Sequence, residues 1–341
     1  MSLGKKKMLS QGAAGGVVGT DHFAPVLYTG NGSTQTITGL NFQPDMVWNK
    51  SLSASFPHYI TDSIRGTGNV LRPSEPDAQS SGDGVSSFDS NGFKVSGGGS
   101  NQNNGSYVAW AWRGAASDAT NNDGSTQSTV RANVDAGFSI VQFSGNLNSA
   151  GNIQVGHGLS SPPELIIQKN TQATGTWWAR PFFLNNNPYQ YLGLSESASL
   201  VTSSSSDGTM AVPTSTTFDN NWNTSLGSAN GVPVIAYCFH SVDGYQKVGS
   251  YSGNQSLNTA NQINFGFTPR FVLIKNTTNT SSQWMLFDSV RTNGMALYAN
   301  QVSTESDYTT DLLLSSQGLE FKSTNINVNQ SGATYIYLAI A

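Results

Sequence analysis

The chain has 341 residues, enough for two or three domains of ordinary size. Only 11% of its residues are charged, and 16 basic residues against 20 acidic ones give a net charge of −4. This composition provides no general field that would attract nucleic acid or an anionic membrane. With 37% hydrophobic and 10% aromatic residues, the chain still has enough apolar side chains to fold around packed cores.

The first residues, MSLGKKKMLSQGAAGG, are rich in glycine and alanine and precede any recurring pattern. Only Met8 and Leu9 follow Lys5, Lys6 and Lys7 as apolar residues, far short of the roughly 7 to 15 of a secretory signal. No window approaches the roughly 18 apolar residues of a membrane span. We therefore expect synthesis in the cytoplasm without a signal peptide, no membrane insertion, and an extended N-terminal arm over residues 1–24.

From residue 25 onward, four landmarks recur three times in the same order. An aromatic residue opens a tight polar turn in YTGN, FSGN and YSGN. A proline and a short apolar strand then lead to a lysine, at Lys50, Lys169 and Lys275. An aromatic residue lies nine residues after each lysine, at Tyr59, Trp178 and Trp284. An apolar strand closes each copy, with the sequences YVAWAW, VIAYCF and YIYLAI.

The three copies divide the chain into units of ordinary small-domain size. We name residues 25–113 copy 1, residues 137–240 copy 2 and residues 241–341 copy 3, and we interpret residues 114–136 as a polar linker. The apolar segments are short, rich in β-branched and aromatic residues, and separated by Gly, Asn and Ser clusters. The sequence therefore predicts an all-β chain of three tandem antiparallel β-sandwich, jelly-roll-like domains.

The closing strands predict where the cores lie, because side chains alternate along a strand. Large residues occupy positions two, four and six, including Trp110 and Trp112, and a small residue occupies position five, including the only cysteine, Cys238. We expect both faces of the strand to be covered and the strand to be central in its sheet. An exposed tryptophan stacking platform and a nucleophilic Cys238 are the less favoured interpretations.

Copies 1 and 3 share an acid and a base at one spacing, in ITDSIR and LFDSVR. Asp62 with Arg65, and Asp288 with Arg291, suggest a turn held by a carboxylate and a guanidinium. We interpret both pairs as structural loop clamps, because a catalytic carboxylate would need a second acid or base at a suitable spacing. Copy 2 has no acid at the corresponding place.

No other motif points to chemistry. The four histidines, at positions 22, 58, 157 and 240, have no spacing typical of a metal site, and FDSNG fits a hairpin turn better than a calcium loop. Nucleophile, phosphate-loop and dinucleotide motifs are absent from the sequence. A single cysteine excludes an intramolecular disulfide framework. We predict no catalytic residue, no metal and no cofactor.

The G-F-x-P strand that ends in I-K, the aromatic residue followed by Asp and Arg, the hairpins GFKV and GLEF, and the closing Y-I-Y-x-A resemble tandem β-domains in virion proteins of tailed, notably marine, bacteriophages. The resemblance covers nearly all of residues 25–341 and is poorest in copy 2. It implies a tail-fibre, tail-tip or other appendage protein of the virion. Its arm, with Lys5, Lys6, Lys7, Met8 and Leu9, would dock on other virion proteins, and its outer loops would meet a host-surface glycan or protein.

Alternatives remain open at this point. The same features fit a capsid decoration or head-fibre protein. A polysaccharide-degrading tailspike is an alternative of another class and would need a pair of carboxylates. A free cellular carbohydrate-binding module is a third. Appendage proteins are often homotrimers, yet three tandem copies can also supply threefold-like surfaces from fewer chains.

Overall fold

A computed structural model describes residues 17–145, 153–203, 210–220, 231–254, 257 and 263–341. Antiparallel strands dominate this part of the chain, with two short 3-10 helices, η1 (Gly19–Asp21) and η2 (Gly98–Ser100). The predicted all-β class is therefore confirmed. Within the described ranges, no helix has the length and apolar character needed to cross a membrane. The predicted docking residues at positions 5–9 lie outside the described residues.

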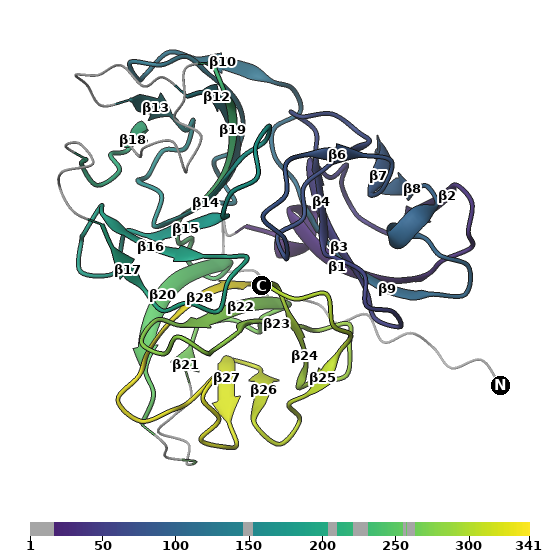
Figure 1. The fold of residues 1–341 in the computed structure, drawn as a ribbon, viewed down its shortest axis with the longest axis vertical. Helices are drawn as coiled ribbons and strands as arrows, with labels where there is room; N and C mark the ends of the chain where they lie inside the picture. Colours follow the sequence, from purple (N-terminus) through teal and green to yellow (C-terminus); the bar gives the residue numbers. More distant parts are fainter. Residues whose placement is uncertain (1–16, 146–152, 204–209, 221–230, 255–256, 258–262) are drawn as a thin grey trace.

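Each copy contributes one sheet unit with the same strand order (Figure 1). In copy 1 the order is β1 (Phe23–Thr29), β9 (Ser106–Trp112), β3 (Met46–Ser51) and β4 (Tyr59–Asp62). In copy 2 it is β12 (Phe138–Ser144), β19 (Pro233–Phe239), β14 (Leu165–Asn170) and β15 (Trp178–Pro181). In copy 3 it is β20 (Gln246–Ser252), β28 (Thr334–Ile340), β22 (Phe271–Asn276) and β23 (Trp284–Asp288). The closing strand has a neighbour on each side in every copy, so its predicted central position is confirmed.

Two of these sheets continue further. In copy 2, β10 (Ala119–Asn121) and β11 (Ser128–Asn133) precede β12, and β16 (Gln190–Gly193) and β17 (Val201–Thr202) follow β15. In copy 3, β24 (Met295–Tyr298) and β25 (Ser306–Asp307) follow β23. The segment 114–136 thus differs from the predicted linker, because β11 pairs with β12 along its whole length. Val130 is buried there, and the Arg131 guanidinium holds Asp45 of copy 1 at 2.5 Å, which explains why a polar segment is ordered.

A smaller set of strands covers the outer face of each main sheet. These strands are β2 (Gln35–Thr38), β8 (Gly92–Val95) and β7 (Val85–Asp89) in copy 1, β13 (Gln154–Gly156) and β18 (Thr217–Asp219) in copy 2, and β21 (Ile263–Asn264), β27 (Gly318–Phe321) and β26 (Leu312–Ser315) in copy 3. A short pair, β5 (Asn69–Val70) and β6 (Ser80–Ser81), lies beside β4. Small residues of the closing strands, such as Ala109 and Cys238, pack in these outer clusters, which give the chain its β-sandwich character.

The opposite faces of the three main sheets pack against one another in one shared apolar core. Positions two, four and six of the closing strands all belong to it: Val108, Trp110, Trp112, Ile235, Tyr237, Phe239, Ile336, Leu338 and Ile340. Phe271 of copy 3 contacts Trp110 and Trp112 of copy 1 at ring-centroid distances of 5.7 and 5.5 Å. The space left at the centre is about 10 Å³, so the centre is filled by side chains. Figure 1 shows the copies as three lobes around this centre.

Candidate functional site

The copies meet along three seams, which we name seam 1/2, seam 2/3 and seam 1/3. Equivalent residues follow from the strand registers, in which Trp284 lies opposite Lys275. When the corresponding registers of the other copies are extended by one residue, Trp177 lies opposite Lys169 and His58 opposite Lys50. Tyr59 and Trp178, the aromatic landmarks predicted from the spacing of nine residues after the lysine, therefore lie one residue beyond the structural equivalents of Trp284. His58 takes the place of an aromatic residue in copy 1, and sequence spacing alone concealed this.

Each seam contains the same hydrogen bond, from a ring nitrogen of one copy to a backbone carbonyl of the next. The three bonds are Trp284 Nε1 to Gly193 O at 2.8 Å, Trp177 Nε1 to Arg72 O at 2.9 Å, and His58 Nε2 to Tyr298 O at 3.0 Å. They lead from copy 3 to copy 2, from copy 2 to copy 1, and from copy 1 to copy 3. This single rotational sense is what threefold pseudosymmetry requires.

His58 can take the tryptophan's role because its ring is held in one neutral tautomer. Trp48 Nε1 donates to His58 Nδ1 at 2.9 Å, so Nε2 carries the proton and donates to Tyr298 O. Burial, with a smaller contribution from the positive charge of Lys50, lowers the pKa of His58 well below its ordinary value. The histidine is therefore neutral and acts as a seam donor, which argues against a metal-binding or titrating role.

The three repeated lysines are buried at the seams and held by carbonyl oxygens. Their shortest contacts are Lys50 Nζ to Ser51 O at 2.8 Å, Lys169 Nζ to Asn170 O and Ala173 O at 2.8 Å each, and Lys275 Nζ to Ser282 O at 2.7 Å. Lys50 also reaches Val302 O of copy 3 at 3.1 Å, and Lys275 reaches Ser197 O of copy 2 at 2.9 Å. Burial lowers the pKa of Lys50 and Lys169 to about 8 and that of Lys275 to about 7.

The two predicted clamps are buried ion pairs. Arg65 Nε lies 2.6 Å from Asp62 Oδ2, and Arg291 Nε lies 2.6 Å from Asp288 Oδ2. The other carboxylate oxygen of each aspartate accepts the backbone N–H of its own arginine, at 2.9 and 3.0 Å. Each pair therefore closes the turn after its strand, as the D-S-x-R spacing predicts.

Each buried aspartate also accepts a hydrogen bond from a neighbouring copy, which sequence reasoning missed. Tyr237 Oη donates to Asp62 Oδ2 at 2.7 Å across seam 1/2, and Trp110 Nε1 donates to Asp288 Oδ2 at 3.0 Å across seam 1/3. Both donors occupy position four of a closing strand. Burial, reinforced by the Asp62 carboxylate, raises the pKa of Tyr237 well above its ordinary value, so its hydroxyl stays protonated.

Seam 2/3 lacks this polar arrangement at the equivalent positions. The strand registers place Pro181 where the other copies have aspartate, and Leu338 where they have tyrosine or tryptophan. The acid missing from copy 2 is therefore matched by an apolar residue, Leu338, in the neighbouring copy 3.

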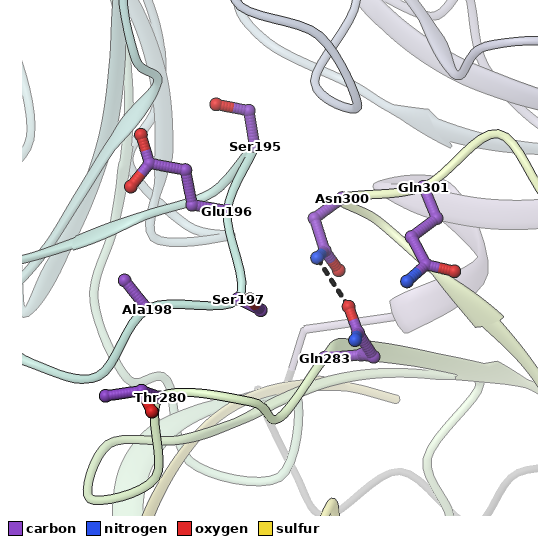
Figure 2. Close-up of a pocket in the computed structure, with 8 residues that line it drawn as sticks. All are labelled: Ser195, Glu196, Ser197, Ala198, Thr280, Gln283, Asn300 and Gln301. Atoms are coloured by element: carbon purple, nitrogen blue, oxygen red, sulfur yellow. Dashed lines mark hydrogen bonds between the residues drawn. The ribbon is translucent and has the colours of Figure 1, made fainter.

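Seam 2/3 carries an open groove of about 510 Å³ (Figure 2). The loop of residues 195–198 in copy 2 forms one wall, and Thr280, Gln283, Asn300 and Gln301 of copy 3 form the other. Asn300 Nδ2 donates to Gln283 Oε1 at 2.6 Å, while Asn300 Oδ1 accepts the Trp284 N–H at 3.1 Å. These bonds fix the amides of the second wall in place.

A second groove, of about 710 Å³, opens at seam 1/2 between residues 64, 65, 78 and 79 of copy 1 and residues 142, 171, 172 and 233 of copy 2. Gln79 N donates to Thr171 O at 2.8 Å beside it. No cluster of three potential metal ligands occurs in the part of the chain that the structure describes. The candidate sites are thus polar grooves between copies.

Family comparison treats the three copies as one unit. A profile described as a domain of unknown function, DUF7483, matches residues 18–341. The chain belongs to the DUF7483 family. The profile of this family spans all three copies, in agreement with the core that they share. No curated protein and no solved structure matches the chain.

Proposed function

We propose that this chain is a non-enzymatic structural protein of a tailed bacteriophage virion, a tail-fibre or tail-tip component that contributes to host attachment. In this proposal, three tandem β-sandwich, jelly-roll-like domains act as one rigid body. The arm that joins it to other virion proteins is limited to residues 1–16 of the predicted segment 1–24, because Val17 packs against the shared core and β1 begins at Phe23. Threefold pseudosymmetry within one chain supports it, because homotrimeric appendages offer the same arrangement from three chains.

The observation that carries the proposal is the separation of the two ends of the pseudosymmetry axis. At one end, Val17, the first described residue, and Ala341 pack against the shared core, and the pairing of Ile340 with Phe271 places Ala341 beside the start of β22. A Cβ at Gly19 would lie 3.0 Å from Ala341 O, so the chain before β1 passes this end. The other end, beyond Lys275 and the end of β22, carries the groove at seam 2/3. An arm that docks at the first end leaves the second end free to meet a host.

A polysaccharide-degrading tailspike is the second candidate, and the acids it would use are poorly placed for it. Glycoside cleavage needs two carboxyl groups beside the scissile bond. Asp62 is 0% exposed and Asp288 is 2% exposed, and each already accepts bonds from an arginine and a neighbouring copy. A substrate polymer cannot reach either carboxylate in this arrangement. Reducing ends released from host polysaccharide, and lost on Asp62 substitution in a folded variant, would favour the tailspike.

Deletion of residues 1–16 tests the proposal in assembled particles. We expect the shortened chain to keep the unfolding transition of the full chain, because the shared core and the strands that form it lie within residues 17–341, and to disappear from purified particles. Incorporation at the normal level would refute docking by the arm. Absence of the full chain from purified particles would refute the virion assignment. Its position and copy number in an intact particle separate a tail component from a capsid decoration or head-fibre protein.

A further inference from the structure

The copy 3 wall of the groove at seam 2/3 has side chains that differ from those at the equivalent positions of the other two copies, and the fold does not require this difference. Its residues have equivalents in the other copies, because the same backbone turn occurs three times. The defining bonds are Gln301 N to Tyr298 O at 3.0 Å, Glu196 N to Gly193 O at 3.3 Å, and Glu75 N to Arg72 O at 3.0 Å. Each residue of the copy 3 wall can therefore be compared with the equivalent residues of copies 1 and 2.

Three amides line the copy 3 wall where the other copies have different side chains. Gln283, Asn300 and Gln301 correspond to Thr176, Ser195 and Glu196 in copy 2 and to Pro57, Ser74 and Glu75 in copy 1. Asn300 keeps a structural role, because Ser74 Oγ accepts the His58 N–H at 3.2 Å as Asn300 accepts that of Trp284. The two glutamines have no such counterpart, so the architecture of the repeat does not account for them.

The two glutamine amides retain hydrogen-bonding capacity toward the groove. In copy 2 the equivalent side chains satisfy each other, since Thr176 Oγ1 donates to Glu196 Oε1 at 2.6 Å. In copy 3, Gln283 Oε1 accepts from Asn300, and Gln301 Oε1 accepts from Ser303 at 3.3 Å. Neither NH₂ group bonds to a described residue, and Figure 2 shows both amides on the same side of the groove. Four N–H donors are therefore available to a ligand.

The charge of the groove selects against anions. Glu196 is the charged residue among the lining side chains, and it is acidic. The nearest amine described at this seam, Lys275 Nζ, is 0% exposed and donates to Ser197 O and Ser282 O, so it offers nothing to a ligand's phosphate or carboxylate. Residues 195 and 197 contribute hydroxyl groups to the opposite wall, on the loop that also carries Glu196 (Figure 2). The lining thus combines amide donors with hydroxyl and carboxylate acceptors and carries no accessible cation.

We propose that the groove at seam 2/3 binds a neutral oligosaccharide. Adjacent sugar hydroxyls both donate and accept, which matches amide and hydroxyl groups presented close together. The volume of about 510 Å³ lies in the range of small-ligand sites. Because the lining has no aromatic ring for stacking, binding rests on hydrogen bonds, whose net contributions are small, and a single groove binds with a Kd on the order of 1 mM. The proposal deepens the proposed host attachment and rests on it for the source of the sugar.

The test is a saturation-transfer NMR titration of the full chain with neutral trisaccharides of glucose, galactose and N-acetylglucosamine, and with trigalacturonate as the anionic match. We expect saturable binding of at least one neutral sugar and none of trigalacturonate. The double variant Gln283→Thr, Gln301→Ala should bind at least tenfold more weakly. Its matched control is Gln317→Ala, which removes an exposed amide of copy 3 that lines neither groove and should bind like the native chain.

Three results would overturn the proposal: no binding of any neutral trisaccharide, preference for trigalacturonate, or equal binding by the double variant and the control. Thermal unfolding of each variant shows that it is folded, and the single variant Gln301→Ala replaces the double one if that fails. If the chain binds a neutral sugar but is absent from purified particles, only the virion assignment is refuted. A chain present in particles that binds no sugar refutes the groove alone.

Discussion

Seams 1/2 and 1/3 differ from seam 2/3 at equivalent positions, and the difference shows how the copies recognise one another. The first two seams bury an aspartate, its arginine and a ring or hydroxyl donor from the neighbouring copy. The third has Pro181 and Leu338 at those positions. Matching therefore occurs across a seam and not within a copy. If the copies followed the reverse order around the axis, Leu338 would meet Asp62 and leave that carboxylate without its neighbour's donor.

Removing a carboxylate should produce the largest effect. Asp62→Ala leaves the buried Arg65 without its counter-ion and Tyr237 without its acceptor, so we expect the free energy of unfolding to fall by about 3 to 5 kcal/mol. Urea unfolding measures this. Asp135→Ala, at an exposed acid, is the control and should change stability by less than about 0.5 kcal/mol. A loss below about 1 kcal/mol for Asp62→Ala would mean that the pair is solvated.

Buried lysines should make stability depend on pH. Because burial lowers the pKa of Lys275 to about 7 in the folded chain, against 10.5 ordinarily, the unfolded chain binds more protons between these values. The free energy of unfolding should therefore rise between pH 7 and 9, and Lys275→Met should reduce its slope by up to about 1.4 kcal/mol per pH unit. Lys322→Met, at an exposed site, should leave the slope unchanged. Equal slopes in both variants would show that Lys275 is not buried.

Removing one donor from a polar seam should have a smaller effect. Tyr237→Phe deletes only the hydroxyl that donates to Asp62, so we expect a loss of about 1 to 3 kcal/mol. Tyr245→Phe is the control. Tyr245 also belongs to the shared core, but its hydroxyl makes no hydrogen bond to a described residue. The same loss in both variants, measured by urea unfolding, would count against a specific bond across seam 1/2.

The repeat allowed much of the fold to be predicted from the sequence. Alternation along the closing strands correctly predicts that Trp110, Trp112 and Cys238 are buried, and the central place of these strands follows from their apolar residues on both faces. The strands within residues 114–136 were harder to predict, because the segment is polar in composition. They are stabilised by pairing with β12 and by the contact between Arg131 and Asp45.

The seams were not predictable in the same way, because one sequence does not reveal which copy faces which. A signal was nevertheless present. A lysine lies near the end of the same apolar strand in every copy, which fits a buried amine better than a solvated one. In addition, copy 2 lacks the aspartate, and copy 3 has leucine at position four of its closing strand. The groove amides were also visible only as departures from the repeat, once the strand registers had aligned Gln283 and Gln301 with Thr176 and Glu196.

Native-state hydrogen exchange of the Leu338→Ala variant tests most directly whether the three copies form one cooperative unit. The substitution opens a cavity in the shared core at the seam where Pro181 replaces the buried aspartate, and it should lower stability by about 2 to 5 kcal/mol. If the copies unfold together, amides of β9, β19 and β28 lose protection by the same amount. Loss confined to β20, β22 and β28, with β9 and β19 as protected as before, would contradict a single unit built around the shared core.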